Sequence, residues 1–229
     1  MTSGRDRLRQ LAALLAAARE AERIAAEVAA AQARLAPHAS LQRALHQQGR
    51  QELLHAGLFS AALACLPRGA PLPRLDAALG GFRRRLQADL QAGRLAASMF
   101  GLQHVLEALG HVALQPPPGE LAGLGDRYLP LRGLLAQHET AHHRLGERWV
   151  PRLAAALSTS GRQALLDSGR DYLALADACV QAGLEACAPF EAERLQYAHA
   201  TSQCLARLAA ALRQACEPAP IARRDPGGG

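Results

Sequence analysis

The stretch LQRALHQQGRQELLHAGLFSAALACL, from Leu41 to Leu66, decides the fold of this chain. Apolar residues recur in it at alternating three- and four-residue steps, the pattern of a helix with one buried face. Two polar side chains interrupt that face, Glu52 and His55, and they lie one helical turn apart. Pro67 follows the pattern and ends it. The stretch therefore predicts a long helix that turns a carboxylate and an imidazole toward the interior.

Prolines and glycines divide the rest of the chain into further helical segments. The six predicted helices cover residues 6–36, 41–66, 82–115, 126–157, 162–188 and 190–216. Short connections join the first helix to the second and the third to the fourth, so each pair is expected to form an antiparallel hairpin. The connection 67–81 is much longer, and when extended it reaches about 50 Å, the length of a bundle. The predicted fold is therefore all-α, with a four-helix bundle and a long crossover between its second and third helices.

Composition supports the all-helical prediction. The chain has 229 residues, of which 49% are hydrophobic and only 3% aromatic, and most of the apolar residues are Ala and Leu. Such a composition favours helices and argues against β-sandwiches, barrels, doubly wound sheets and intrinsic disorder. The net charge of +6 comes from Arg alone, since the chain has no Lys. We interpret it as a general Arg surplus, and nucleic-acid binding is not expected.

Cysteine usage and the N-terminus predict a cytoplasmic protein. The five cysteines include no CxxC pair, and an odd number does not indicate a disulfide framework. The apolar run Leu11–Ala18 follows several arginines, but it is short and continues into charged helix, so it is interpreted as part of the first helix. The sequence has no apolar run of the length of a membrane span.

Ionisable residues interrupt the apolar faces of the other three bundle helices as well. Each of two helices contributes one Glu, and each of the other two contributes Glu-x-x-His, whose spacing places both side chains on one face. These six residues are Glu22, Glu52, His55, Glu107, Glu139 and His142. Burying four carboxylates and two imidazoles without partners is very costly, and a cation removes that cost. Six such ligands can hold two metals, and mixed carboxylate and imidazole ligands suit iron or manganese.

The order of these residues indicates an internal duplication. Glu22, Glu52 and His55 recur as Glu107, Glu139 and His142 at nearly equal offsets along the chain. A lone Glu-x-x-His is a weak signal, and the alternative is that these are solvated charges on helix surfaces. The repeated placement favours two hairpins that each supply half of one site.

The motifs resemble those of the ferritin-like di-iron carboxylate superfamily. The segment QELLHAGLF, residues 51–59, looks like the second helix of that superfamily, and HETAHHRLG, residues 138–146, looks like the fourth. LEALG, residues 106–110, is similar to the Glu-bearing third helix, and Glu22-Arg23 matches the first. The resemblance implies two irons. It places the first on Glu22, Glu52 and His55 and the second on Glu107, Glu139 and His142, with a mixed Mn/Fe centre left open.

Further polar residues near these ligands allow more than one interpretation. Gln48 and Gln103 lie on the seams one turn before Glu52 and Glu107, so they orient ligands, line a cavity or are ordinary buried amides. His104, His111 and His138 are expected near the ligands, where they hydrogen-bond the ligand residues or lie on the surface. The alternative is a separate metal site built from these three histidines and Glu107. Glu20 competes with Glu22 as the ligand from the first helix but lies off the apolar seam.

These observations lead to a domain plan and to ranked functions. Residues 1–157 are expected to form the ferritin-like di-metal bundle, 158–216 an appended helical hairpin that packs on it or forms a homodimer surface, and 217–229 a disordered tail. We expect a di-iron oxidoreductase, an oxidase or oxygenase that uses O₂, an unidentified small substrate and a separate electron donor. The alternatives are an iron-handling or peroxide-detoxifying protein and, less favoured, a metal-free helical interaction module.

Overall fold

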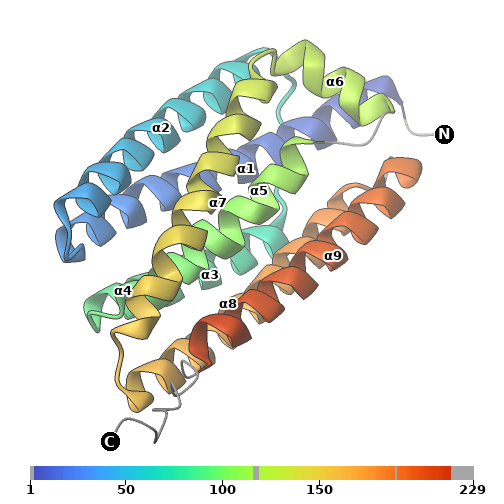
Figure 1. The fold of residues 1–229 in the computed structure, drawn as a ribbon. Coiled ribbons are helices and arrows are strands. Elements are labelled where there is room, and N and C mark those ends of the chain that lie inside the picture. The colour runs from blue at the N-terminus through green and yellow to red at the C-terminus, as the bar shows by residue number, and fades with distance from the viewer. Residues whose placement is uncertain (1–2, 116–118, 189, 218–229) are drawn as a thin grey trace, which may run out of the picture.

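The protein is all-helical throughout the part of the chain that the computed structural model describes, residues 3–115, 119–188 and 190–217 (Figure 1). Those residues form no β-strand. The elements are α1 (Gly4–Leu35), α2 (Ala39–Ala64), α3 (Pro73–Gln91), α4 (Leu95–Met99), the π-helical segment η1 (Phe100–Leu106), α5 (Glu107–Leu114), α6 (Glu120–Tyr128), α7 (Arg132–Ala155), α8 (Thr159–Ala186) and α9 (Glu191–Cys216). None of these helices has both the length and the apolar content that crossing a bilayer requires.

The first two helices form the expected hairpin. Ser3 caps the start of α1, where its hydroxyl accepts a hydrogen bond from the backbone N–H of Asp6 at 3.2 Å. The helix ends at Leu35, and the next residue, Ala36, is extended because Pro37 disfavours the helical conformation before it. α2 then returns along α1, and their facing sides are buried through Ile24, Ala29 and Leu45 among others.

The crossover between the hairpins differs from the prediction because most of it is helical. α3 occupies Pro73–Gln91, where an extended connection over 67–81 and the start of the third helix were predicted. Pro73 suits the first turn of a helix, which needs no N–H from that residue. Phe82 and Leu86 are fully buried, and their packing outweighs the cost of about 1 kcal/mol for each glycine inside the helix.

Gly93 ends the crossover and turns the chain. Its φ of 69° lies in the left-handed region, which glycine adopts without steric cost. α4, η1 and α5 then follow one another in a single direction, so the predicted helix 82–115 is broken into two antiparallel segments around residues 92–94. α3 has by then returned the chain to the end of the bundle where α2 begins, and α2 and α5 consequently run in the same direction (Figure 1).

The second hairpin pairs α4–η1–α5 with α7. Its connection holds the short helix α6, so the predicted fourth helix, residues 126–157, begins later than expected, at Arg132. Pro130 accounts for the break, since it cannot donate a helical hydrogen bond. Pro151 lies inside α7 without ending it. The predicted stop at 116–118 and the tail beyond Glu217 lie outside the described residues.

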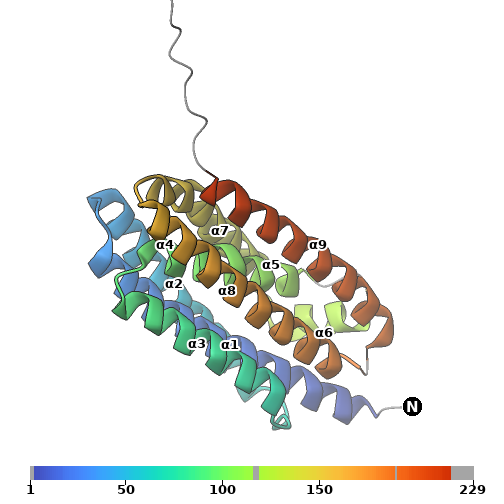
Figure 2. The same cartoon turned by 90° about the horizontal axis from the view of Figure 1, so that it is seen from below.

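The last two helices pack on the second hairpin and on the crossover helix α3 (Figure 2). α8 packs mainly on α3 and α9, and α9 also contacts α5 and α7. A buried polar cluster fixes α8 to α3, in which the fully buried Asp89 accepts a hydrogen bond from the Tyr172 hydroxyl at 2.8 Å. Arg94 and Arg85 neutralise that carboxylate, with their Nε atoms 2.7 and 3.3 Å from its oxygens.

Candidate metal centre

Four helices bring six ionisable side chains together at one level of the interior. α1 supplies Glu22 and α5 supplies Glu107, while α2 and α7 each supply a Glu and a His three residues apart: Glu52 and His55, and Glu139 and His142. The spacing works as the sequence predicts, because residues three apart on a helix share a face. Five of the six are buried, and the Glu22 side chain is 12% exposed.

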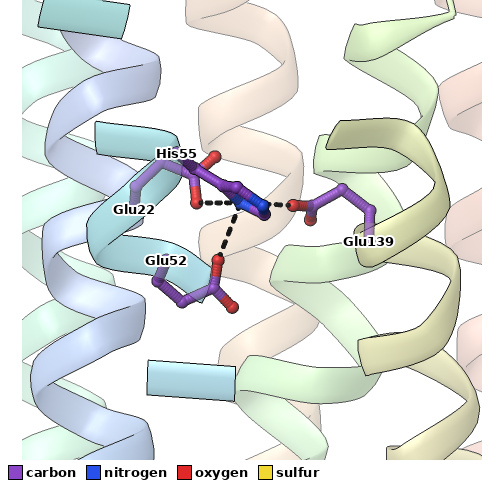
Figure 3. Close-up of side chains that lie close together, drawn as sticks. All are labelled: Glu22, Glu52, His55 and Glu139. Carbon is purple, nitrogen blue, oxygen red and sulfur yellow. Dashed lines mark hydrogen bonds and ion pairs between the residues drawn. The ribbon is translucent and has the colours of Figure 1, made fainter. Parts of the chain in front are cut away.

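The first group surrounds the ring of His55 (Figure 3). Its Nδ1 atom lies 3.2 Å from Glu22 Oε2, 3.1 Å from Glu52 Oε2 and 3.4 Å from Glu139 Oε1. The four residues each offer a ligand atom, and these atoms all lie within 4.8 Å of one another. Side chains from three different helices, α1, α2 and α7, therefore converge on one point.

The second group surrounds His142 and overlaps the first. His142 Nδ1 lies 3.0 Å from Glu52 Oε1 and 3.3 Å from Glu107 Oε2. With Glu139, these residues again offer ligand atoms within 4.8 Å of one another. Glu52 and Glu139 belong to both groups, so the two groups are adjacent and share two carboxylates.

The protein alone does not balance the charges of this cluster. Burial raises the pKa of Glu22 and Glu107, and the charges of Glu139 and Glu52 raise both further. Burial also opposes the charged forms of Glu52 and His55, but the interaction of Glu52 with His142 and then His55, and that of His55 with Glu139, Glu22 and Glu52, prevail. The pKa of Glu52 is lowered, and that of His55 is raised to about 11. Some carboxylates thus compete for protons while another holds an imidazolium, as expected where negative charge exceeds positive charge.

Two carboxylate oxygens of the cluster lack a partner that a cation could supply. Glu52 Oε2 and Glu139 Oε1 are buried and have no hydrogen-bond partner. Their nearest nitrogen is His55 Nδ1, but one Nδ1 proton cannot satisfy three carboxylates. Buried unpaired anionic oxygens are costly, and a metal ion is the group that several carboxylates and an imidazole satisfy together. The cluster could therefore hold a metal ion.

The outer nitrogens of both imidazoles are held by residues that precede the shared carboxylates. His142 Nε2 lies 2.9 Å from Gln51 Oε1, and His55 Nε2 lies 3.0 Å from His138 Nδ1. Since Gln51 Oε1 only accepts, His142 donates from Nε2 and its Nδ1 lone pair faces the carboxylates. This arrangement orients metal-binding histidines in proteins. His138 was expected near the ligands from the sequence and Gln51 was not, although both stand one residue before a shared Glu.

A chain of buried amides supports the carboxylates from the other side. Gln48 Nε2 donates to Glu52 Oε1 at 3.0 Å and to Glu107 Oε1 at 2.7 Å. Gln103 Nε2 donates to Gln48 Oε1 at 3.0 Å and to Gln32 Oε1 at 2.7 Å. Gln48 therefore orients two carboxylates directly, and Gln103 acts through Gln48 rather than on a carboxylate. Gln32 was not singled out in the sequence, where it looks like any polar residue of α1.

Two further histidines that the sequence singled out, His104 and His111, are not part of the two ligand groups. His104 is buried against Phe100 and His143, with ring centroids 5.4 Å from each, and neither of its nitrogens has a partner. His111 contacts the Thr140 hydroxyl at 3.1 Å and the Ala136 carbonyl at 3.3 Å. The alternative metal site built from His104, Glu107, His111 and His138 is therefore not assembled. Glu20 faces Arg83 at the surface, away from the cluster.

An apolar cavity adjoins the cluster. Its volume is about 320 Å³, and three of the carboxylates line it, those of Glu22, Glu107 and Glu139. The rest of its wall is mostly aliphatic and comes from α1, α5, α6, α8 and α9, together with one or two residues each of α2, α3, η1 and α7. The cluster therefore borders a space of the size that small-molecule sites have in proteins.

Comparison with known protein families and with curated proteins finds no match for this chain. The function is therefore inferred from the buried cluster and its surroundings.

Proposed function

We propose that the protein is a ferritin-like di-iron carboxylate protein that acts as an O₂-dependent oxidase or oxygenase on a small substrate. The observation that carries the proposal is the pair of overlapping ligand groups that share Glu52 and Glu139. Two adjacent sites with two common carboxylates are what a pair of bridged metals requires. The parallel direction of α2 and α5, with a crossover between the hairpins, supports the resemblance to the ferritin-like bundle.

The assignment of ligands follows the two groups. Glu22, Glu52 and His55 would hold one iron, and Glu107, Glu139 and His142 the other, with Glu52 and Glu139 between them. Carboxylates with one imidazole for each metal suit iron, and a mixed Mn/Fe pair would use the same ligands. Bound iron would supply the reduction of O₂, which the side chains of this chain do not perform.

The surrounding residues hold the ligands and control protons. Gln48 fixes the orientation of Glu52 and Glu107, and Gln51 and His138 fix the imidazole rings. His138 is half-buried, and it contacts the fully buried His55 through its Nδ1 atom. This contact gives a path for a proton between the surface and the buried ring.

The overall reaction of an oxygenase balances with an external reductant. One substrate C–H bond, one O₂, two electrons and two protons give one C–OH group and one water. The two electrons would come from a separate donor, such as a reduced flavin or an iron–sulfur protein. An oxidase would instead take two electrons and two protons from its substrate, and O₂ would be released as H₂O₂.

Anaerobic reconstitution with Fe(II), followed by metal analysis and an optical spectrum, tests the proposal. We expect two irons per chain in the parent protein and a loss of bound iron in the Glu52→Ala/Glu139→Ala double variant. Glu20→Ala is the matched control, since Glu20 lies on the same helix as Glu22 but pairs with Arg83 at the surface. Normal iron content in the double variant would refute the assignment, and no iron in the folded parent would favour a metal-free interaction module.

Iron handling or peroxide removal is the second candidate, and oxygen consumption distinguishes it. The cavity beside the carboxylates favours the oxidase or oxygenase, because storing iron needs no apolar pocket. Consumption of O₂ or H₂O₂ by the reduced protein at full rate without any organic substrate would instead support the second candidate.

A further inference from the structure

The cavity beside the carboxylates is extended along α1. Along α1 its lining runs from Ala25 to Leu11, which at 1.5 Å per residue spans about 20 Å. Glu22 stands at one end of this run, and Glu107 and Glu139 line the cavity as well. Its volume of about 320 Å³ corresponds to about ten water-sized volumes, or a molecule of about ten heavy atoms. The space thus extends from the ligand cluster toward the N-terminal half of α1.

The wall of the cavity carries almost no free charge apart from the three carboxylates. Among the described residues that line it, Arg132 alone is basic. Arg132 pairs with Asp126 and donates to the Leu114 carbonyl at 3.0 Å, and its Nε atom has no partner. The Tyr197 hydroxyl donates to the Ala113 carbonyl at 3.1 Å. Burial raises the pKa of both cysteine thiols in the wall, Cys179 and Cys187, to about 11, so both are neutral at pH 7. The charge of Arg132 is already paired with Asp126, so an anionic ligand would have to compete with that carboxylate.

We infer that this cavity is the substrate site and that it takes a neutral, elongated, apolar molecule of about ten heavy atoms. Aliphatic side chains from α1, α5 and α8 enclose such a molecule, and its end would lie beside Glu22, Glu107 and Glu139. Which group of the bound molecule reacts depends on the proposed function, but the binding of an apolar molecule in the cavity does not. Binding is therefore measurable on the protein without metal.

Calorimetric titration with 1-octanol tests the inference, with octanoate as the charged probe of equal chain length. We expect 1-octanol to bind with a negative heat-capacity change, because apolar surface is buried. Octanoate should bind at least roughly tenfold more weakly, because its carboxylate would be buried without a partner. Octanoate that binds as tightly as 1-octanol would overturn the neutral class and would indicate that Arg132 accepts an anion.

Two variants that fill the cavity from opposite walls locate the binding. Ala18→Phe on α1 and Val180→Phe on α8 should each weaken 1-octanol binding by roughly a hundredfold, since each ring takes the place of several buried methylenes. Ala61→Phe, an equal change at an exposed position of α2 outside the cavity, should leave the affinity unchanged. Helical circular dichroism and the melting temperature show which variants are folded. Unchanged affinity in either folded cavity variant would overturn the location.

The same titration on Fe(II)-loaded protein separates this inference from the proposed function. Binding of 1-octanol to a protein that takes up no iron would leave the cavity site in place and refute the di-iron function. Uptake of iron without 1-octanol binding would refute the cavity site and leave the function in place. If both hold, the bound alcohol should shift the optical spectrum of the centre, and the spectrum of Ala18→Phe should not shift.

Discussion

Gly110 of α5 lies against the Glu139 carboxylate, and adding one methyl group there tests the geometry of the centre. A Cβ atom at Gly110 would lie 2.9 Å from Glu139 Oε2, closer than real Cβ contacts come. Glu139 would have to move by about 0.5 Å to restore an ordinary contact. Metal–ligand distances tolerate about 0.2 Å. The Gly110→Ala variant should therefore keep its fold and lose metal.

The expected changes in stability and in metal affinity have opposite signs. Alanine in a helix interior is about 1 kcal/mol more favourable than glycine. The Glu139 carboxylate is the flexible end of its side chain, so moving it costs the metal-free protein little. We therefore expect Gly110→Ala to unfold at the same or a higher urea concentration than the parent. Displacement of a carboxylate that belongs to both ligand groups should weaken Fe(II) binding by roughly ten- to a hundredfold or more.

Gly57→Ala is the matched control. Gly57 lies in α2, on the helix that carries two of the ligands, and a Cβ there would meet nothing within 4 Å. It should raise the free energy of unfolding by up to about 1 kcal/mol and leave Fe(II) affinity unchanged. Urea unfolding of metal-free protein and anaerobic competition with a coloured Fe(II) chelator measure the two quantities. Parent-like Fe(II) affinity in a folded Gly110→Ala variant would refute the role of Glu139 as a ligand.

Three further predictions concern the support of the fold and of the centre. Gln51→Leu should lower Fe(II) affinity by roughly ten- to a hundredfold in the same competition assay, because His142 loses the acceptor for its Nε2 proton; unchanged affinity would refute that role. Asp89→Ala should lower the free energy of unfolding by about 3 kcal/mol in urea, because a buried ion-pair network loses its anion; a loss below about 1 kcal/mol would contradict this. Burial lowers the pKa of His104 from 6.5 to about 4. The unfolded chain therefore binds a proton at a higher pH than the folded protein, and the free energy of unfolding should fall by about 3 kcal/mol as the pH drops from 6.5 to 4. His104→Phe should flatten this part of the pH profile, and an unchanged slope would show that other groups cause it.

The sequence allowed the residues of the centre to be predicted because their signal is local. Glu52 and His55 stand on a helical face whose other members are apolar, and a 3.6-residue period is enough to show that they point inward. Glu107, Glu139 and His142 repeat the order of the first three residues, which predicted that the second half of the centre lies at the same level of the bundle. The structure brings all six together, while their binding of iron stays a prediction.

The elements that were mispredicted depend on contacts between distant parts of the chain. The proline- and glycine-rich start of α3 has the composition of a loop, and it is helical because Phe82 and Leu86 pack inside the fold. The π-helical segment η1 has no sequence signal of this kind. Every residue from Phe100 to Val105 is buried, as is every residue of the α-helical α4 before it, because α3, α7, α8 and α9 surround this stretch. Tertiary packing decides both, and a single sequence does not display it.

The crossed contacts at the two imidazoles bear on how such a centre arises. Gln51 of the first hairpin holds His142 of the second, and His138 of the second holds His55 of the first. Neither hairpin therefore forms a complete site alone. Each carries one imidazole and one side chain that contacts the imidazole of the other hairpin. A gene for one hairpin would already encode a whole centre once two copies of its product paired about a two-fold axis. Fusion of two such genes, joined through α3, would then free each half to diverge, and Gln51 and His138 are the equivalent positions at which the two halves carry different residues.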